Sequence, residues 1–204
     1  MKRFLDIVFS LLVLAVGLPF GLVIALLIVL DSKGSVIYRQ SRVGRNNVDF
    51  RLYKFRTMCV AADRGSLITV GADDARITRV GAFLRKFKID EFPQFLNILK
   101  GEMSMVGPRP ERPEIAAEYE KEMPEFALRL QAKAGITGYA QVYGKYNTTP
   151  YDKLQMDLMY ISRPSIIEDI KILFATLMIL FRPESTEGVA PGSVNAGSDD
   201  QPAA

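Results

Sequence analysis

The chain has 204 residues, enough for one ordinary domain with a short appendage rather than two large catalytic domains. Hydrophobic residues make up 49% and charged residues 24%, a balance that excludes collagen-like and wholly disordered proteins. The absence of histidine excludes histidine-based triads, imidazole general bases and histidine-ligated metal or haem sites. The single cysteine, Cys59, excludes an intramolecular disulfide.

Residues 7–30 form an uncharged apolar segment of membrane length. As a helix, it would extend roughly 36 Å, against about 30 Å for a hydrocarbon core. Pro19, flanked by Gly17 and Gly21, favours a kink or break in its middle, and both flanks are basic. Because basic flanks favour the cytoplasm, we expect residues 1–32 to form a re-entrant membrane helix. A straight span is the alternative, and a secretory signal is the weakest one.

Residues 34–58 alternate in places between apolar and polar side chains around the turn-like residues 44–47. This pattern predicts a short two-stranded β-ribbon. Seven basic side chains and one acid lie between residues 33 and 56. They form either a solvated face or a surface that contacts anionic lipid head groups or a phosphorylated ligand.

The next segments are predicted to be a loop and two helices. Residues 60–75 are rich in Gly, Asp and Ser and are expected to form the loop. Apolar residues at helical spacing predict a helix over 76–88. Asp90 is expected to cap the next helix at its N-terminus, and Gly101 is expected to end it.

Two more helices are expected in the C-terminal half. Residues 114–133 are predicted to be helical with an interruption near Pro124. Residues 165–181 end in an uncharged stretch of ten residues, roughly 15 Å of helix, which is too short to span a membrane. This helix is either amphipathic and interfacial or part of an ordinary core.

The run 89–94 (IDEFPQ) brings two carboxylates, Asp90 and Glu91, to a predicted helix start. A helix N-terminus attracts negative groups, whether a side chain or a substrate phosphate. Magnesium is typically bound through one or two carboxylates and substrate phosphates. In isolation, however, an Asp-Glu pair at this position more often caps a helix.

Together with other ordered blocks, this run resembles the bacterial monotopic phosphoglycosyl transferases, in the small form that consists of the catalytic unit alone. The resemblance covers about residues 2–181. The blocks that carry it are KFRTM at 54–58, TRVGAFLRK at 78–86, DEFPQ at 90–94 with Asn97, KGEMS at 100–104, VGPRP at 106–110, GITG at 135–138, AQV at 140–142 and DLMYI at 157–161.

The resemblance implies an enzyme that moves a sugar-1-phosphate from a UDP-sugar to polyprenyl (undecaprenyl) phosphate and releases UMP. Asp90 would be the nucleophile that forms an aspartyl phosphosugar, and Glu91 would bind Mg²⁺. Arg85 would lie near the phosphate, and Arg109 would contact the nucleotide sugar. The weaker substrate-binding candidates are Lys54, Arg56, Arg129 and Gln141. Asp157 and Asp169 would either support the metal or pair with neighbours.

The family implies a mixed α/β, mainly helical fold: a single monotopic membrane domain with a re-entrant helix, a short β-ribbon and interfacial amphipathic helices. Residues 33–182 would form the catalytic domain on the cytoplasmic face of the bacterial inner membrane, and residues 183–204 a disordered tail. The expected partners are UDP-sugar, polyprenyl phosphate and membrane lipid, without nucleic acid and with a homodimer as a possibility.

The chain departs from the family pattern at several positions. Leu18 replaces the usual Ser before Pro19, so a hydroxyl that could satisfy a freed carbonyl is missing. Ala134, Tyr139 and Lys145 replace the usual Pro, Trp and Arg. The rival interpretations are a membrane-anchored protein that binds lipid head groups or acts as a scaffold, and direct one-step transfer in which Asp90 and Glu91 only hold metal.

Overall fold

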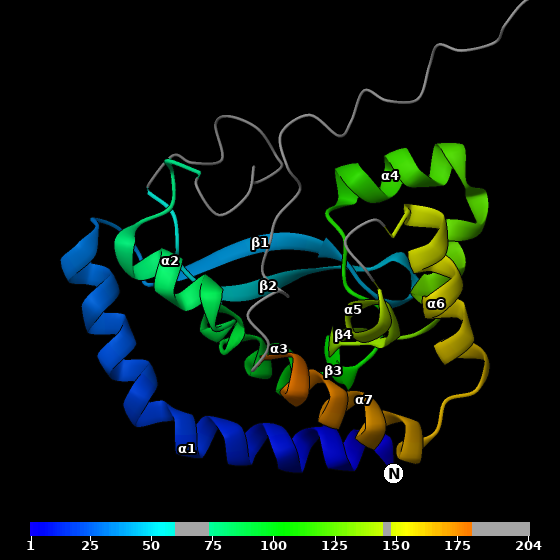
Figure 1. Cartoon of the computed structure of the whole chain (residues 1–204), viewed down its shortest axis with the longest axis horizontal. Helices are drawn as coiled ribbons and strands as arrows, with labels where there is room; N and C mark the ends of the chain where they lie inside the picture. The colour runs from blue at the N-terminus through cyan, green and yellow to red at the C-terminus, as the bar shows by residue number, and fades with distance from the viewer. Residues whose placement is uncertain (60–73, 145–147, 181–204) are drawn as a thin grey trace, which may run out of the picture.

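The computed structural model describes residues 1–59, 74–144 and 148–180. Within these ranges the protein is mainly helical, with two small two-stranded sheets. Figure 1 shows a long N-terminal helix along one side of the domain, with the sheets and shorter helices packed above it. The tail predicted at 183–204 and most of the loop predicted at 60–75 lie outside the described residues.

The apolar N-terminal segment forms one helix, α1 (Lys2–Asp31), with Pro19 inside it. Figure 1 shows that α1 bends about its middle, as expected where proline removes a hydrogen-bond donor and its ring crowds the preceding turn. By length and composition α1 could cross a membrane. Most of its apolar side chains are exposed, including Leu11, Leu12, Val16, Leu18, Phe20, Leu22 and Val23.

The predicted β-ribbon is confirmed. β1 (Ile37–Val43) pairs antiparallel with β2 (Asp49–Phe55), in a register that places Ile37 opposite Phe55. The connection contains a short 3₁₀ turn, η1 (Arg45–Asn47). Asn46 and Asn47 adopt a φ of 59° there, a left-handed conformation that asparagine tolerates better than most residues.

The two following helices confirm one prediction and correct another. α2 (Arg79–Lys86) begins with Thr78 as its N-cap, as expected for the helix predicted over 76–88. Asp90, however, is not the N-cap of the next helix. It lies inside a separate 3₁₀ turn, η3 (Ile89–Glu91), and α3 (Gln94–Lys100) begins after Pro93. Gly101 ends α3 with a φ of 89°, as predicted.

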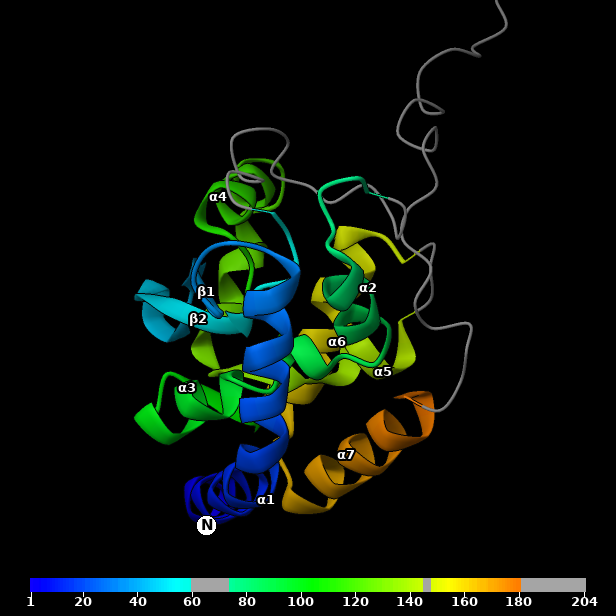
Figure 2. The ribbon, with the colours of Figure 1, turned by 90° about the vertical axis from the view of Figure 1, so that its left-hand side faces the viewer.

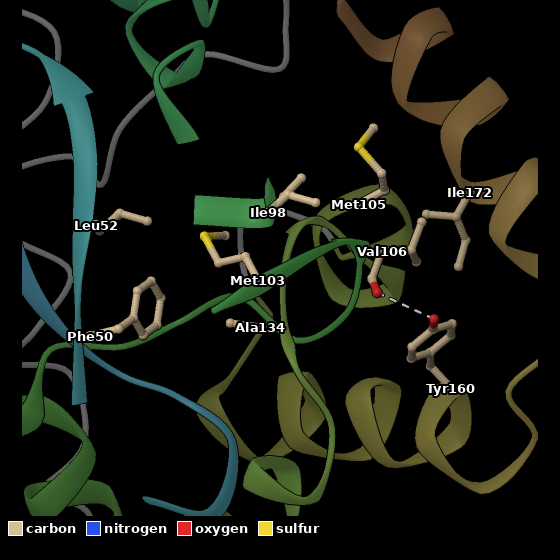
Figure 3. Packing of buried hydrophobic residues seen from close by; sticks show 9 residues of the cluster. All are labelled: Phe50, Leu52, Ile98, Met103, Met105, Val106, Ala134, Tyr160 and Ile172. Carbon is tan, nitrogen blue, oxygen red and sulfur yellow. Dashed lines mark hydrogen bonds between the residues drawn. The ribbon is translucent and has the colours of Figure 1, made fainter. Parts of the chain in front are cut away.

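A second small sheet was not predicted from the sequence. β3 (Met103–Val106) pairs in parallel with β4 (Ala134–Thr137), and all four residues of β3 are buried. Figure 3 shows the main core around these strands, with Phe50 and Leu52 from β2 facing Met103 and Ile98. The backbone of β4 lies very close to the segment that follows β3, since a Cβ at Gly135 would lie 2.2 Å from the Gly107 amide nitrogen.

The C-terminal half is a series of short helices. The interruption predicted near Pro124 is confirmed, because α4 (Pro113–Glu122) ends before a 3₁₀ segment, η4 (Pro124–Gln131). α5 (Tyr139–Tyr143) and α6 (Pro150–Ser162) follow β4.

The last described helix, α7 (Ile166–Leu180), corresponds to the helix predicted over 165–181. It packs against β3, β4 and α5, and Figure 2 shows it near the N-terminal end of α1. Ile172 is fully buried, whereas Ile167, Ile170 and Phe174 are exposed. α7 therefore has a core-facing side and an apolar outer side, a pattern suited to a membrane interface.

Candidate active site

Three separate segments bring charged side chains together around the Asp-Glu pair. Lys54 comes from β2, Asp90 and Glu91 from η3, and Arg109 from the loop after β3. The turn η3 packs against both β2 and α2. The three segments therefore converge because the ribbon and the second sheet share one core.

The contacts centre on Glu91. Its Oε1 accepts hydrogen bonds from Lys54 Nζ at 3.0 Å and from Arg109 Nη2 at 2.9 Å. Lys54 Nζ also lies 3.7 Å from Asp90 Oδ2, so one ammonium group bridges both acids. The Glu91 side chain is 11% exposed and that of Arg109 is 45% exposed, so the arginine lies at the outer edge of the site.

Asp90 is buried, and its environment favours the protonated form more than water would. Burial raises the pKa of the Asp90 carboxyl above its ordinary value of 3.8, and the negative charge of Glu91 adds to that rise. The positive charges of Lys54, Arg85 and Arg109 oppose it. A more basic carboxylate is a better nucleophile once it has lost its proton.

Glu91 behaves in the opposite way. Burial by itself would raise the pKa of the Glu91 carboxyl, but the charges and hydrogen bonds of Arg109 and Lys54 outweigh burial and hold the pKa well below its ordinary value. The Glu91 carboxyl is therefore ionised at neutral pH. The surroundings thus shift the pKa values of the two adjacent acids in opposite directions.

Arg85 supplies a third positive charge close to the pair. Its Nε donates to Thr57 Oγ1 at 2.8 Å, which ties α2 to the end of the ribbon. Burial lowers the pKa of the Arg85 guanidinium, and the charge of Asp90 opposes that change. Lys54, Arg85 and Arg109 outnumber the two carboxylates, and this excess of positive charge suits an anionic substrate such as a diphosphate.

The donor set is compatible with magnesium but small. The described residues contain no group of three or more Asp, Glu, His or Cys side chains placed so that they could hold a metal ion. Among those residues, both contacts of Glu91 use Oε1, which leaves Oε2 available to a cation. Because Mg²⁺ accepts one or two carboxylates and completes its shell with water and phosphate oxygens, Glu91 and Asp90 fit this pattern.

The comparison with known proteins identifies the family. The sequence profile described as "Bacterial sugar transferase" matches residues 1–183. The chain belongs to the bacterial sugar transferase family.

Several curated relatives carry specific names. A UDP-N-acetylgalactosamine-undecaprenyl-phosphate N-acetylgalactosaminephosphotransferase of Aeromonas hydrophila is 40% identical over 179 residues, which cover 86% of this chain and 42% of the relative. A UDP-glucose:undecaprenyl-phosphate glucose-1-phosphate transferase of Klebsiella pneumoniae is 41% identical, with 86% of this chain and 39% of the relative covered. The chain thus spans about two fifths of the length of these two relatives.

A third relative is close to this chain in length. The exopolysaccharide production protein PSS of Rhizobium leguminosarum bv. phaseoli is 40% identical over 187 residues, which cover 87% of this chain and 94% of the relative.

Two of the weaker candidate ligands, Arg56 and Gln141, have mainly structural contacts among the described residues. Arg56 is buried, and its Nη2 donates to the Ser32 carbonyl at 2.6 Å, to Ser32 Oγ at 3.0 Å and to the Ile28 carbonyl at 3.3 Å. It therefore caps the C-terminal end of α1. Gln141 lies in α5, and its Nε2 donates weakly to the Ile136 carbonyl at 3.5 Å.

Arg129 contacts the backbone of the loop that carries Arg109. Its Nη2 donates to Asp157 Oδ2 at 2.7 Å and to the backbone carbonyl of Arg109 at 2.9 Å. Asp157 is 1% exposed, so the pair is deeply buried. Of the two readings for Asp157, the structure therefore shows the ion pair, and Arg129 holds the loop that carries Arg109.

Asp169 also pairs with neighbours. It accepts from Lys2 Nζ at 2.6 Å and from the Tyr160 hydroxyl at 2.6 Å. Pairing with neighbours was one of the two predicted roles of Asp169, but its partners Lys2 and Tyr160 were not predicted, and neither was the contact between Thr57 and Arg85. The presence of Thr57 in the KFRTM block and of Tyr160 in the DLMYI block is the signal that could have indicated them.

Proposed function

We propose that the protein transfers a sugar-1-phosphate from a UDP-sugar to polyprenyl phosphate and releases UMP. The observation that carries this proposal is the buried Asp90 beside the ionised Glu91, surrounded by Lys54, Arg85 and Arg109. The names of the relatives from Aeromonas and Klebsiella describe such transfers to undecaprenyl phosphate. These two relatives have nearly the same sequence identity to this chain, 40% and 41%, yet they are named for different sugars. We therefore leave the sugar unassigned.

In the first step, an Asp90 carboxylate oxygen attacks the phosphorus that already bears the sugar. A bond forms between aspartate and phosphorus, and the bond from that phosphorus to the UMP oxygen breaks. Lys54 and Arg85 lie where they can stabilise charge on the phosphoryl group. Arg109, more exposed than the acids, is suited to the nucleotide side of the diphosphate.

In the second step, a phosphate oxygen of the polyprenyl phosphate attacks the same phosphorus. The bond between aspartate and phosphorus breaks, and the Asp90 carboxylate is regenerated. The attacking oxygen is already anionic, so this step needs no general base, which is consistent with a chain that lacks histidine. A magnesium ion held by Glu91 would neutralise part of the diphosphate charge.

The N-terminal end of α1 is held by the domain, and this supports the proposed re-entrant topology. Lys2 Nζ donates to Asp169 Oδ2 at 2.6 Å and to the Val106 carbonyl at 3.1 Å. Asp6, buried on α1, accepts from Ser104 Oγ at 2.9 Å and from the Met105 amide at 3.1 Å. The first turns of α1 are therefore tied to β3 and α7.

The C-terminal end of α1 is held by the same domain. Asp31 Oδ2 accepts from the Val80 amide at 3.0 Å, at the start of α2, and Arg56 caps the last carbonyls. A helix that crossed a bilayer from side to side would have ends about 30 Å apart on opposite faces. Since one domain binds both ends, we infer that α1 enters and leaves the membrane on the same, cytoplasmic, face.

A turnover assay with matched variants tests the proposed function. Purified protein in detergent is given undecaprenyl phosphate and a panel of UDP-sugars, and UMP release is measured with and without magnesium. We expect magnesium-dependent UMP release with at least one sugar, and loss of that release in Asp90→Asn. Asp49→Asn is the control, because Asp49 is an exposed acid at the start of β2, outside the proposed site.

Two results would contradict parts of the proposal. No UMP release from any sugar in the panel, from folded protein, would favour the lipid-binding or scaffold interpretation. UMP release that survives Asp90→Asn would remove the nucleophile and favour direct transfer.

A further inference from the structure

The bend of α1 is in direct contact with the residue that follows the Asp-Glu pair. Phe92 lies against Gly17, and a Cβ at Gly17 would lie 2.3 Å from Phe92 Cε2 and 2.5 Å from Cζ. Gly17 precedes Pro19 by two residues, so the phenyl ring rests on the segment where the membrane helix bends. No side chain larger than hydrogen fits at position 17 unless the ring moves.

The ring has little freedom to move away. Phe92 is stacked on Phe55, with ring planes 6° apart and centroids 6.3 Å apart, and it contacts Phe95 at a centroid distance of 6.1 Å. It is partly buried and packs against the buried cluster of Ile28, Phe55 and Leu84. Because a packed aromatic cluster resists displacement, pressure on the ring is transmitted to the backbone of residue 92.

That backbone is continuous with the proposed nucleophile. The Phe92 amide donates to the Ile89 carbonyl at 3.1 Å, and the Glu91 amide donates to the Lys88 carbonyl at 3.2 Å. These hydrogen bonds form the 3₁₀ turn that carries Asp90. A shift of the Phe92 backbone therefore moves Asp90 and Glu91 relative to Lys54, which lies on the paired strand β2.

We propose that Gly17 and Phe92 are positioning residues that couple the bend of the membrane helix to the placement of Asp90. The glycine permits the close approach, and the ring sets the distance between α1 and the 3₁₀ turn. This inference rests on the proposed function, in which Asp90 must meet both a nucleotide sugar and a lipid phosphate. It assigns the local shape of α1 a role in catalysis beyond anchoring.

The chain offers a closely matched control at Gly21. Gly21 also lies two residues from Pro19, on its other side, and Gly→Ala has the same effect on helix propensity at both positions. A Cβ at Gly21, however, would lie 3.6 Å from Phe92 Cε1, an ordinary van der Waals distance. Gly17→Ala and Gly21→Ala thus differ mainly in the contact with Phe92.

The test compares wild type, Gly17→Ala, Gly21→Ala, Phe92→Leu and the double variant Gly17→Ala/Phe92→Leu. Three quantities are measured: kcat and donor KM for UMP release, the melting temperature, and amide hydrogen exchange across residues 88–96. We expect Gly17→Ala to lower kcat on the order of 10- to 100-fold, with faster exchange in that segment and a melting temperature close to that of Gly21→Ala. Gly21→Ala should match wild type.

Rescue separates positioning from general damage. Leucine lacks the ring atoms that meet Gly17, so the double variant should regain kcat and exchange to the level of Phe92→Leu alone. The inference is overturned if Gly17→Ala matches Gly21→Ala in kcat and exchange, or if the double variant is as impaired as Gly17→Ala. Should Gly17→Ala fail to fold, unchanged kcat and exchange in Phe92→Leu would overturn it.

A failure of the proposed function gives a different result. In that case wild type releases no UMP from any sugar, while the exchange measurements still report whether Gly17 and Phe92 control the turn that carries Asp90.

Discussion

Asp90 and Glu91 are neighbours in the chain, yet their surroundings shift their acidities in opposite directions. Burial raises the pKa of Asp90, whereas Arg109 and Lys54 overcome burial at Glu91 and lower its pKa. Both cations contact the same oxygen of Glu91, whereas Asp90 has the Lys54 ammonium group at a longer distance of 3.7 Å, with Arg85 and Arg109 acting on it through their charges. The proposed nucleophile Asp90 and the proposed magnesium ligand Glu91 thus differ in how closely positive side chains pair with them.

The raised pKa of Asp90 implies that this residue costs the protein stability. A carboxyl whose pKa is higher in the folded than in the unfolded state destabilises the fold once it is ionised. We therefore expect Asp90→Asn to raise the melting temperature at neutral pH while it abolishes turnover. Melting curves followed by circular dichroism as a function of pH measure this effect.

The pH dependence of the stability gain in Asp90→Asn tests whether burial of the Asp90 charge is its cause. Below the ordinary Asp pKa of 3.8 the carboxyl is protonated in both states, so the advantage of Asp90→Asn should shrink toward zero on acidification. An advantage that stays constant with pH would show that burial of the charge is not its origin. Asp49→Asn, at an exposed site, should show no such advantage.

Glu91 is expected to act through its charge. Glu91→Gln keeps the side-chain volume but removes one hard anionic ligand, and it leaves Lys54 and Arg109 without their shared partner. We expect the apparent magnesium affinity to fall by more than about tenfold. The magnesium dependence of UMP release measures the loss, and an unchanged dependence would place the metal elsewhere.

The sequence could predict which charged residues meet, but only in part. The order of motifs indicated Asp90, Glu91, Lys54 and Arg109, which the structure brings together. The spacing of basic residues along the ribbon does not reveal which neighbour each guanidinium contacts. The sequence therefore did not indicate that Arg56 caps α1, and its role as a ligand stays a prediction.

At the scale of elements, the buried pair of Arg129 and Asp157 connects η4 to α6. Arg129 also holds the Arg109 carbonyl, so it links two structural elements to the active-site loop. Burial raises the pKa of the Asp157 carboxyl, and the charge of Arg129 opposes that rise. Removing Arg129 would leave an acid without its compensating charge in an apolar environment.

We predict that Arg129→Met lowers the free energy of unfolding by about 3–5 kcal/mol, because one partner of a buried ion pair is lost. Adding Asp157→Leu should recover much of that loss, since no unpaired charge remains. Denaturant unfolding of both single variants and the double variant measures the coupling. Additive effects would mean that the pair contributes no interaction of its own.

Elements with a clear periodic pattern could be predicted from the sequence. The ribbon, α2, α7 and the break near Pro124 follow from residue spacing and proline placement. The strands β3 and β4 have only four residues each and are largely buried, so neither strand shows the alternation that marks a half-buried strand. Asp90 resembles an N-cap in the sequence, but the 3₁₀ turn separates it from α3.

At the scale of the whole molecule, the apolar helix α1 is bound by the domain at both ends. Lys2 and Asp6 hold its beginning, and Asp31 and Arg56 hold its end. The bend between these anchors brings Gly17 against Phe92, and this contact is the one by which we propose that the shape of α1 affects the position of Asp90.

A labelling experiment tests the topology. Single cysteines are placed near Lys2 and near Lys33 in a Cys59→Ser background, and intact cells are treated with a membrane-impermeant thiol reagent. We expect both sites to be protected until the inner membrane is opened, because the proposed re-entrant topology places both flanks of α1 on the cytoplasmic face. Reaction of the Lys2 site alone from outside would indicate a straight span.

Replacing Pro19 is expected to favour a membrane-spanning α1 over the proposed re-entrant form. Pro19→Leu restores a continuous apolar helix, so we expect a fraction of molecules to become labelled at the Lys2 site in intact cells. Activity should fall in proportion, since a span would break the contacts of Lys2 and Asp6 with the domain. An unchanged labelling pattern with full activity would show that Pro19 is not needed for the re-entrant topology.

The most direct test of the central claim is the mass of the protein after incubation with a UDP-sugar that it uses, without polyprenyl phosphate. The account predicts an increase equal to one sugar-1-phosphate less one water, located at Asp90, absent in Asp90→Asn and lost when undecaprenyl phosphate is added. UMP should be released as this adduct forms on the protein. UMP release that requires undecaprenyl phosphate and leaves the protein mass unchanged would contradict it.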